Sequence, residues 1–372
     1  MPTDHHAEHV GSLLRPPWLL RARDAHQAGT LSLAELREVE DRAVLELIGL
    51  QEQAGLRVFT DGEARRESWR AGLMESLDGV APATRTMRWY RDGKELSAAE
   101  TLSDGVAATR KVTRKGDLSA VEARFMAAHA PGAFKITMIS ASMGGMIWDP
   151  RLSARAYPTL GDLIEDLATL QIAEIEGLID DGVRWIQLDS LAYNQVIDPS
   201  QAGSSRAGAA PRAALEAAIA TDSRLVTAIK AKNPGVTVGM HICRGNYRSS
   251  WMAKGSYEPV AERLFNEVPV DRFLLEYDTD RVGGFEPLRF VPRGASAPTV
   301  VLGLVTTKVP RLEDQDDLCR RVEEAARYVP AENLAISPQC GFASGSLGNL
   351  ITVDDERRKL DLIVSAARQV WG

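Results

Sequence analysis

Hydrophobic and polar positions follow two alternating patterns along most of the chain. Short apolar, β-branched runs suit buried parallel strands, and the longer segments between them carry apolar residues every three or four positions, as helices do. Such runs begin near His9, Val58, Phe134, Trp185, Val236, Phe273, Thr299 and Leu334. Because helical patterns separate most of them, the sequence predicts an α/β fold in which parallel strands and crossover helices close into a (β/α)8 TIM barrel.

Local signals support this division of the chain. Ser32 and Glu35 form a capping-box pattern at the start of a long helical segment, and Gly55 follows its end. Further helices are expected over residues 161–179, 211–232, 260–265, 314–327 and 353–370. An open doubly wound sheet is the alternative fold, but no G-x-G-x-x-G motif follows the first predicted strand.

The alternation breaks between residues 80 and 116. Residues 89–94 read as a β-hairpin, and residues 109–113 as another strand. We therefore expect one barrel domain over residues 1–372, with a β excursion inserted over 80–116 after the second strand. This insertion either covers a site or is an ordinary surface excursion.

Composition narrows the possible functions. A length of 372 residues is enough for one such barrel or for two domains. A net charge of −7 argues against a nucleic-acid partner, and no apolar run is long enough to cross a membrane. The first residues show no signal-peptide pattern, and three cysteines are too few for a disulfide framework. We expect a cytoplasmic protein with reduced thiols.

Four residues at predicted strand ends form a candidate metal site. His241 and Cys243 end the fifth strand, and alternation along an extended chain directs both side chains to the same side. Glu276 ends the sixth strand, and Cys340 follows the eighth. One nitrogen, two sulfurs and one carboxylate suit tetrahedral Zn²⁺. The alternative is a buried histidine with two inert core thiols.

Three more polar residues, Ser12, Glu63 and Asp189, also lie at or just after predicted C-terminal strand ends. In a (β/α)8 barrel this rim is the catalytic face. Two thiolates and one carboxylate make the zinc site anionic, which keeps a substrate sulfur nucleophilic. The ligand set therefore favours alkylation of a thiol over hydrolysis.

These motifs resemble the catalytic barrel of cobalamin-independent methionine synthase and its short single-barrel relatives, which include epoxyalkane:coenzyme M transferase. The matching stretches are residues 9–12, 61–63, 186–189, 241–243, 275–276 and 338–341. The resemblance implies zinc ligands at His241, Cys243, Glu276 and Cys340. It implies that the amino acid part of homocysteine binds at Gly11, Ser12, Glu63 and Asp189. It also places Trp148 near the position where the family stacks the pterin of its folate donor.

Two departures from the family pattern affect these expectations. The full-length enzyme has a second, N-terminal barrel without a counterpart in this sequence. The family's histidine after the seventh strand aligns with Lys308. A lysine is a poorer acid than histidine at neutral pH, so we expect a catalytic Lys308 to favour donors other than methyltetrahydrofolate, such as a corrinoid, a sulfonium compound or an epoxide. Alternatively, Lys308 points outward and Thr306 or Thr307 lines the pocket.

The expected activity is that of a zinc-dependent S-methyltransferase or S-alkyltransferase that activates homocysteine or a similar small thiol. Its partners would be a small-molecule thiol and an alkyl donor, with no nucleic acid and no membrane, and its oligomeric state stays open. Two alternatives remain: thiol addition to an epoxide, as in epoxyalkane:coenzyme M transferase, and a non-catalytic barrel that zinc stabilises.

Overall fold

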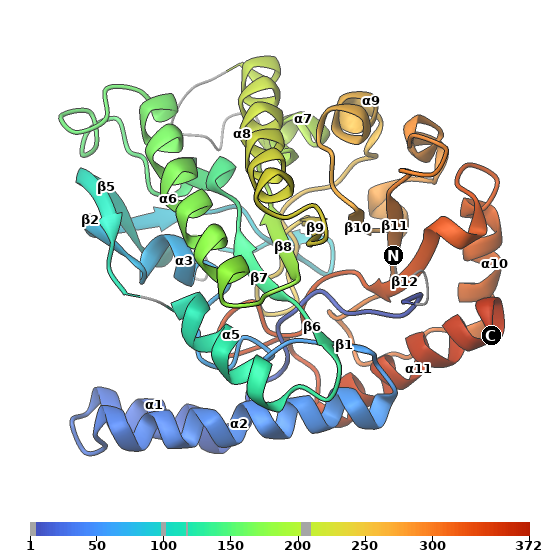
Figure 1. Cartoon of the computed structure of the whole chain (residues 1–372), viewed down its shortest axis with the longest axis horizontal. Helices are drawn as coiled ribbons and strands as arrows, with labels where there is room; N and C mark the ends of the chain where they lie inside the picture. The colour runs from blue at the N-terminus through green and yellow to red at the C-terminus, as the bar shows by residue number, and fades with distance from the viewer. Residues whose placement is uncertain (1–4, 98–101, 117, 202–209) are drawn as a thin grey trace.

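The computed structural model describes residues 5–97, 102–116, 118–201 and 210–372. At its centre lies a parallel sheet of six strands that follow one another in chain order (Figure 1). These strands are β7 (Ile136–Ile139), β8 (Trp185–Ser190), β9 (Thr237–Ile242), β10 (Arg272–Glu276), β11 (Thr299–Val305) and β12 (Leu334–Pro338). Apart from the first residue of β9 and of β11, every position in them is buried, as expected for parallel strands covered on both faces.

Helices connect the strands and cover the outside of the sheet (Figure 1). The long ones are α1 (Pro17–Gln27), α2 (Leu33–Ala54), α5 (Leu118–His129), α6 (Leu160–Asp180), α8 (Pro211–Lys232), α9 (Glu258–Glu267), α10 (Gln315–Ala325) and α11 (Val353–Trp371). The short ones are α3 (Ala71–Met74) and α7 (Asn194–Ile197), with 3-10 turns at Ala141–Met146, Pro199–Gln201, Asp280–Val282, Glu286–Phe290 and Ala331–Asn333. No helix among the described residues is long and apolar enough to cross a membrane.

The predicted helix ends are confirmed where a capping hydrogen bond, a glycine or a proline fixes them. Ser32 accepts a hydrogen bond from the backbone of Glu35, and the Glu35 carboxylate accepts one from the backbone of Ser32. Gly55 ends α2 in the left-handed region, with φ at 85°. Pro211 takes the first position of α8, where its missing N–H costs no hydrogen bond.

The fold is TIM-barrel-like, but the predicted first strand is wrong in extent. Among the described residues that region makes one bridge, from Ala7 to Ile336 of β12. The backbone N–H of Glu8 still donates to the carbonyl of Ile336, and its side chain pairs with Lys135 and Arg272, but residues 8–12 form no strand. The second predicted strand is shortened to β1 (Val58–Phe59), which pairs in parallel with β6 (Ala133–Phe134).

An antiparallel ribbon projects from the chain between β1 and β6. Strand β2 (Leu77–Thr86) pairs with β5 (Leu102–Arg114), and β3 (Tyr90–Arg91) pairs with β4 (Lys94–Glu95). Part of the predicted excursion, residues 98–101, lies outside the described residues. Asp92 and Gly93 both adopt positive φ at the β3–β4 turn, as a two-residue hairpin requires. Tyr90 bridges to Trp251, so the hairpin lies beside the loop that follows β9.

Candidate metal centre and thiol cavity

The four predicted metal ligands converge at the C-terminal ends of β9, β10 and β12. Their nitrogen, sulfur and oxygen atoms lie within 4.8 Å of one another, and all four residues (His241, Cys243, Glu276 and Cys340) are buried. The two sulfur atoms are 3.6 Å apart. Tetrahedral zinc with Zn–S bonds of about 2.3 Å would separate two sulfurs by about 3.8 Å. The spacing therefore fits two thiolates on one zinc ion and is too long for a disulfide.

Hydrogen bonds orient two of these ligands. The His241 Nδ1 atom lies 3.1 Å from the carbonyl oxygen of Leu274, while its buried Nε2 atom has no hydrogen-bond partner among the described residues. A proton on Nδ1 leaves the Nε2 lone pair available to a metal ion. Glu276 accepts hydrogen bonds from the backbone N–H of Arg244 and, at 3.1 Å, from the Arg281 side chain. The residues present thus fit a divalent metal ion.

The charges of the cluster also favour a cation. Burial lowers the pKa of His241, but the adjacent Cys340, Asp189 and Glu276 outweigh burial and raise it to about 9. The contact with Cys243, together with His241, holds the pKa of Cys340 well below its usual range. Contact with Cys340 and burial hold the pKa of Cys243 above its usual range. A metal ion that replaces these shared protons would satisfy the whole cluster.

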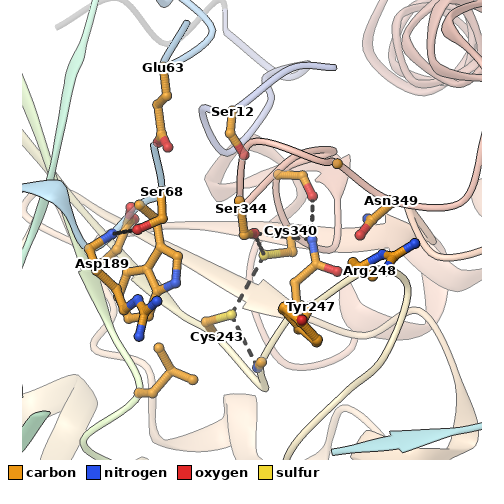
Figure 2. Close-up of a pocket in the computed structure, with 18 of the residues that line it drawn as sticks. Ser12, Glu63, Ser68, Asp189, Cys243, Tyr247, Arg248, Cys340, Ser344 and Asn349 are labelled. Atoms are coloured by element: carbon orange, nitrogen blue, oxygen red, sulfur yellow. Dashed lines mark hydrogen bonds between the residues drawn. The ribbon is translucent and has the colours of Figure 1, made fainter. Parts of the chain in front are cut away.

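A cavity of about 310 Å³ opens directly onto the cluster. His241, Cys243 and Cys340 contribute to its wall, together with the predicted residues Ser12, Glu63 and Asp189. Figure 2 shows Ser12, Glu63 and Asp189 arranged around the same space as the two cysteines. Apolar and aromatic side chains form much of the remaining wall: Val10, Trp69, Met87, Trp89, Met146, Leu191 and Met252. We call this space the thiol cavity.

Glu63 has the features of a residue held in place for a ligand. It adopts a left-handed backbone conformation, with φ at 55°, which is uncommon for a residue with a side chain. Its Oε1 atom accepts a hydrogen bond of 3.0 Å from Thr137, whereas its buried Oε2 atom has no partner among the described residues. A Cβ at Gly11 would lie 2.9 Å from Oε1, so glycine allows this close packing.

Asp189 supplies a second carboxyl group in the thiol cavity. It is buried at the end of β8, and its Oδ1 atom accepts a hydrogen bond of 2.8 Å from Gln187. Burial, with the nearby charge of Glu63, raises the pKa of Asp189 to about 7, although His241 acts in the opposite direction. Two carboxyl groups and the Ser12 hydroxyl therefore present a site suited to an ammonium group.

Comparison with known proteins identifies the family. The model of the cobalamin-independent synthase catalytic domain matches residues 7–369. The chain belongs to the cobalamin-independent methionine synthase family. It is 36% identical over 367 residues to the uncharacterized Bacillus subtilis protein YxjG, a match that covers 98% of this chain and 94% of YxjG.

Two further relatives carry the methionine synthase name. A methionine synthase of Saccharolobus solfataricus is 24% identical over 341 residues, covering 90% of this chain and 86% of that protein. The crystal structure of a putative vitamin-B12-independent methionine synthase from Listeria monocytogenes aligns with a TM-score of 0.72 at 30% identity. That alignment covers 99% of this chain and 98% of the other.

Trp148, which the resemblance places near the family's pterin, does not line the thiol cavity. Its side chain is buried in the main hydrophobic core, and its Nε1 atom donates a hydrogen bond of 3.1 Å to the carbonyl of Tyr157. Trp69 and Trp89 line the thiol cavity instead. Trp89 lies between β2 and β3, so its place depends on the ribbon's packing against the rim, which no local pattern shows.

Lys308 also lies outside the wall of the thiol cavity. It follows β11, is only 8% exposed, and its Nζ atom has no hydrogen-bond partner among the described residues. It is nevertheless close enough to Glu276 to act on it. Burial raises the pKa of Glu276, but Lys308, Arg281 and His241 together bring it below its usual value. Lys308 is therefore buried but does not line the thiol cavity, and neither Thr306 nor Thr307 lines it. The catalytic role of Lys308 stays a prediction.

Two arginines in the wall of the thiol cavity are additional candidates for substrate binding. Arg70 is partly buried and Arg248 is exposed, and neither has an ion pair among the described residues. Arg248 and Ser249 both have positive φ, at 46° and 66°. In the sequence, Arg248 stands five residues after Cys243 of the His-x-Cys motif. Arg244, in that motif's next position, is instead fully buried over the ring of Tyr257.

Proposed function

We propose that this chain is a zinc-dependent thiol S-alkyltransferase that acts on homocysteine or a similar small amino thiol. The observation that carries the proposal is the cluster of His241, Cys243, Glu276 and Cys340 at the wall of a cavity that also contains Glu63 and Asp189. Zinc, when bound, supplies Lewis acidity that converts a coordinated thiol into its thiolate near neutral pH. Reduced cysteine ligands fit a cytoplasmic protein.

The thiol cavity's own side chains would bind and orient the amino thiol. Glu63 and Asp189 offer carboxylate oxygens to its ammonium group, and the Ser12 hydroxyl lies on the same wall. With the ammonium group held there, the sulfur of a short side chain extends toward Cys243 and Cys340. Orientation of this kind converts a bimolecular encounter into reaction within one complex.

The apolar wall would control the second substrate. Trp69, Trp89 and Met252 line the same cavity, and they suit the exclusion of water around a reacting carbon. Lys308 is separated from this wall, so we assign it an electrostatic role beside Glu276 and no proton transfer to a leaving group. Donors whose leaving group needs no protonation, such as a corrinoid or a sulfonium compound, fit this arrangement better than a folate.

Metal analysis tests the proposal, with the third cysteine as a matched control. The native chain should contain about one zinc ion, and the Cys243→Ser, Cys340→Ser double variant should contain none. Cys319→Ser should keep its zinc, because Cys319 lies in α10 within the main core. Zinc that persists in the double variant would remove the basis of the proposal. If zinc is lost as expected, a screen of thiols against methyl, sulfonium, corrinoid and epoxide donors would identify the reaction and test the epoxide alternative.

A purely structural zinc site is the second candidate, because all four ligands are buried. It predicts that a chelator unfolds the chain, as in small zinc domains. The extensive hydrophobic core argues against this dependence, since a barrel of this size has enough buried apolar surface without metal. A metal-free chain that keeps its cooperative thermal transition would exclude the structural role.

A further inference from the structure

A second cavity, of about 800 Å³, lies beside the thiol cavity and shares none of its wall residues. The loops after β9, β10 and β11 form one side of it, and the β3–β4 hairpin forms the other. Its volume is in the range of small-molecule sites. We call it the basic cavity because cationic side chains dominate its wall. These are Arg88, Arg91, Lys254, Arg281, Lys308 and Arg311, against Asp92, Asp198 and Asp278.

One segment of the ribbon separates the two cavities. Met87 and Trp89 line the thiol cavity, whereas Arg88 and Tyr90 line the basic cavity. This alternation follows from an extended chain, whose successive side chains point to opposite faces. Two backbone hydrogen bonds of 2.8 Å and 3.0 Å join Tyr90 to Trp251 and hold the segment in place. The insertion thus forms a shared wall with an apolar face and a cationic face.

Internal ion pairs neutralise only part of the positive charge in the basic cavity. Arg88 pairs with Glu95, and Arg281 pairs with Glu276 and Asp278. The other cations have no carboxylate oxygen within 4.0 Å among the described residues. These are Arg91, Lys254, Lys308 and Arg311. The cavity therefore has an excess of unpaired positive charge at its wall, which attracts anions.

Lys308 gives the strongest indication of a ligand. The residue is 8% exposed, and its Nζ atom is buried without a hydrogen-bond partner among the described residues. A buried ammonium group without hydrogen bonds is costly, so an acceptor is expected beside it. Glu276 and Asp278 are near enough to influence it, but their oxygens lie beyond ion-pair distance and both bond to Arg281.

We propose that the basic cavity binds a small, multiply charged anion with phosphate or carboxylate groups. One anionic group would accept hydrogen bonds from Lys308 at the inner wall. The others would contact Arg91, Lys254 and Arg311, which are more accessible to solvent. This binding site is separate from the thiol cavity, because the two cavities have no wall residue in common. Arg281 and Lys308 in its wall also act on the metal ligand Glu276.

Calorimetric titration of the zinc-loaded native chain with tripolyphosphate and with citrate tests the proposal. At least one of these two anions should bind, and its affinity should fall as salt is added. The anion that binds more tightly shows whether the site recognises phosphate or carboxylate groups. Lys308→Met should weaken binding about tenfold or more. The matched control is Arg320→Ala on α10, outside both cavities, where Arg320 pairs with Asp317 and Glu324. It should bind like the native chain.

Two further variants separate this site from the metal centre. The Cys243→Ser, Cys340→Ser variant should bind the anion as the native chain does, and loss of binding there would assign the anion to the metal centre and overturn the proposal. Equal binding by Lys308→Met, or no binding of either probe by the native chain, would also overturn it. If Lys308→Met does not fold, the more exposed pair Arg91→Ala, Lys254→Ala provides the same test.

Discussion

Replacement of Glu63 by glutamine isolates one negative charge in the thiol cavity. The amide keeps an oxygen that can accept the hydrogen bond from Thr137, and Arg66 keeps its ion pair with Glu122. The fold should therefore tolerate the change. What is lost is the carboxylate charge. Its Oε1 atom lies 3.8 Å from the Arg66 guanidinium, whereas its Oε2 atom has no partner among the described residues and is free to accept a hydrogen bond from a substrate ammonium group.

The expected loss follows from the energy of one buried, charge-assisted hydrogen bond. Such bonds contribute about 1.5–3 kcal/mol, because both groups leave water on binding. At about 1.4 kcal/mol per factor of ten, kcat/KM for an amino thiol should fall roughly 10- to 150-fold. The assay compares homocysteine with 4-mercaptobutanoate, which has the same chain without the amino group. The second thiol should lose little or nothing in the variant.

Glu67→Gln serves as the control for this comparison. Glu67 lines the same thiol cavity, but about half of its side chain is exposed (51%), so solvent screens its charge. It should change kcat/KM by less than about threefold for either thiol. An equal loss for both thiols in Glu63→Gln, or no loss for homocysteine, would refute the assignment of Glu63 to the ammonium group.

Two further predictions concern buried carboxyl groups. Glu8→Gln should lower the free energy of unfolding by about 3–5 kcal/mol, because Lys135 and Arg272 would lose their buried partner. Burial raises the pKa of Glu8, but its ion pairs with Arg272 and Lys135 outweigh burial and lower it to about 2. This stability should therefore be present above about pH 4.5 and lost toward pH 2, as denaturant titrations at several pH values would show. Burial raises the pKa of Asp189 to about 7, so affinity for methionine, whose sulfur carries no proton, should increase as pH rises through 7 in calorimetric titrations. Asp189→Asn should remove that increase, and an unchanged pH profile would count against the role of Asp189.

Local signals in the sequence were sufficient for the elements whose ends are set by neighbouring residues. The capping pair of Ser32 and Glu35, Gly55 at the end of α2, and Pro211 at the start of α8 all behave as predicted. Each works through a hydrogen bond or a backbone preference within a few residues. Such interactions are the same in any fold, so the sequence determines them alone.

The convergence of the four candidate metal ligands was predictable for a related reason. Parallel strands in a barrel end at one rim, so ligands at strand ends converge once the strands are recognised. His241 and Cys243 end β9, Glu276 ends β10, and Cys340 follows β12. The order of the strands was therefore enough to predict that residues almost a hundred positions apart in the sequence lie side by side.

The tertiary structure alone decided which side chains face which cavity. Trp148 points into the core and Trp89 into the thiol cavity, although both are aromatic residues near the rim. Lys308 lines the basic cavity, and residues 8–12 form no regular strand although they follow the bridge at Ala7. These outcomes depend on packing between segments far apart in the chain, where small differences in burial and charge pairing select one orientation. No local pattern encodes that balance, because it exists only when the whole fold is assembled.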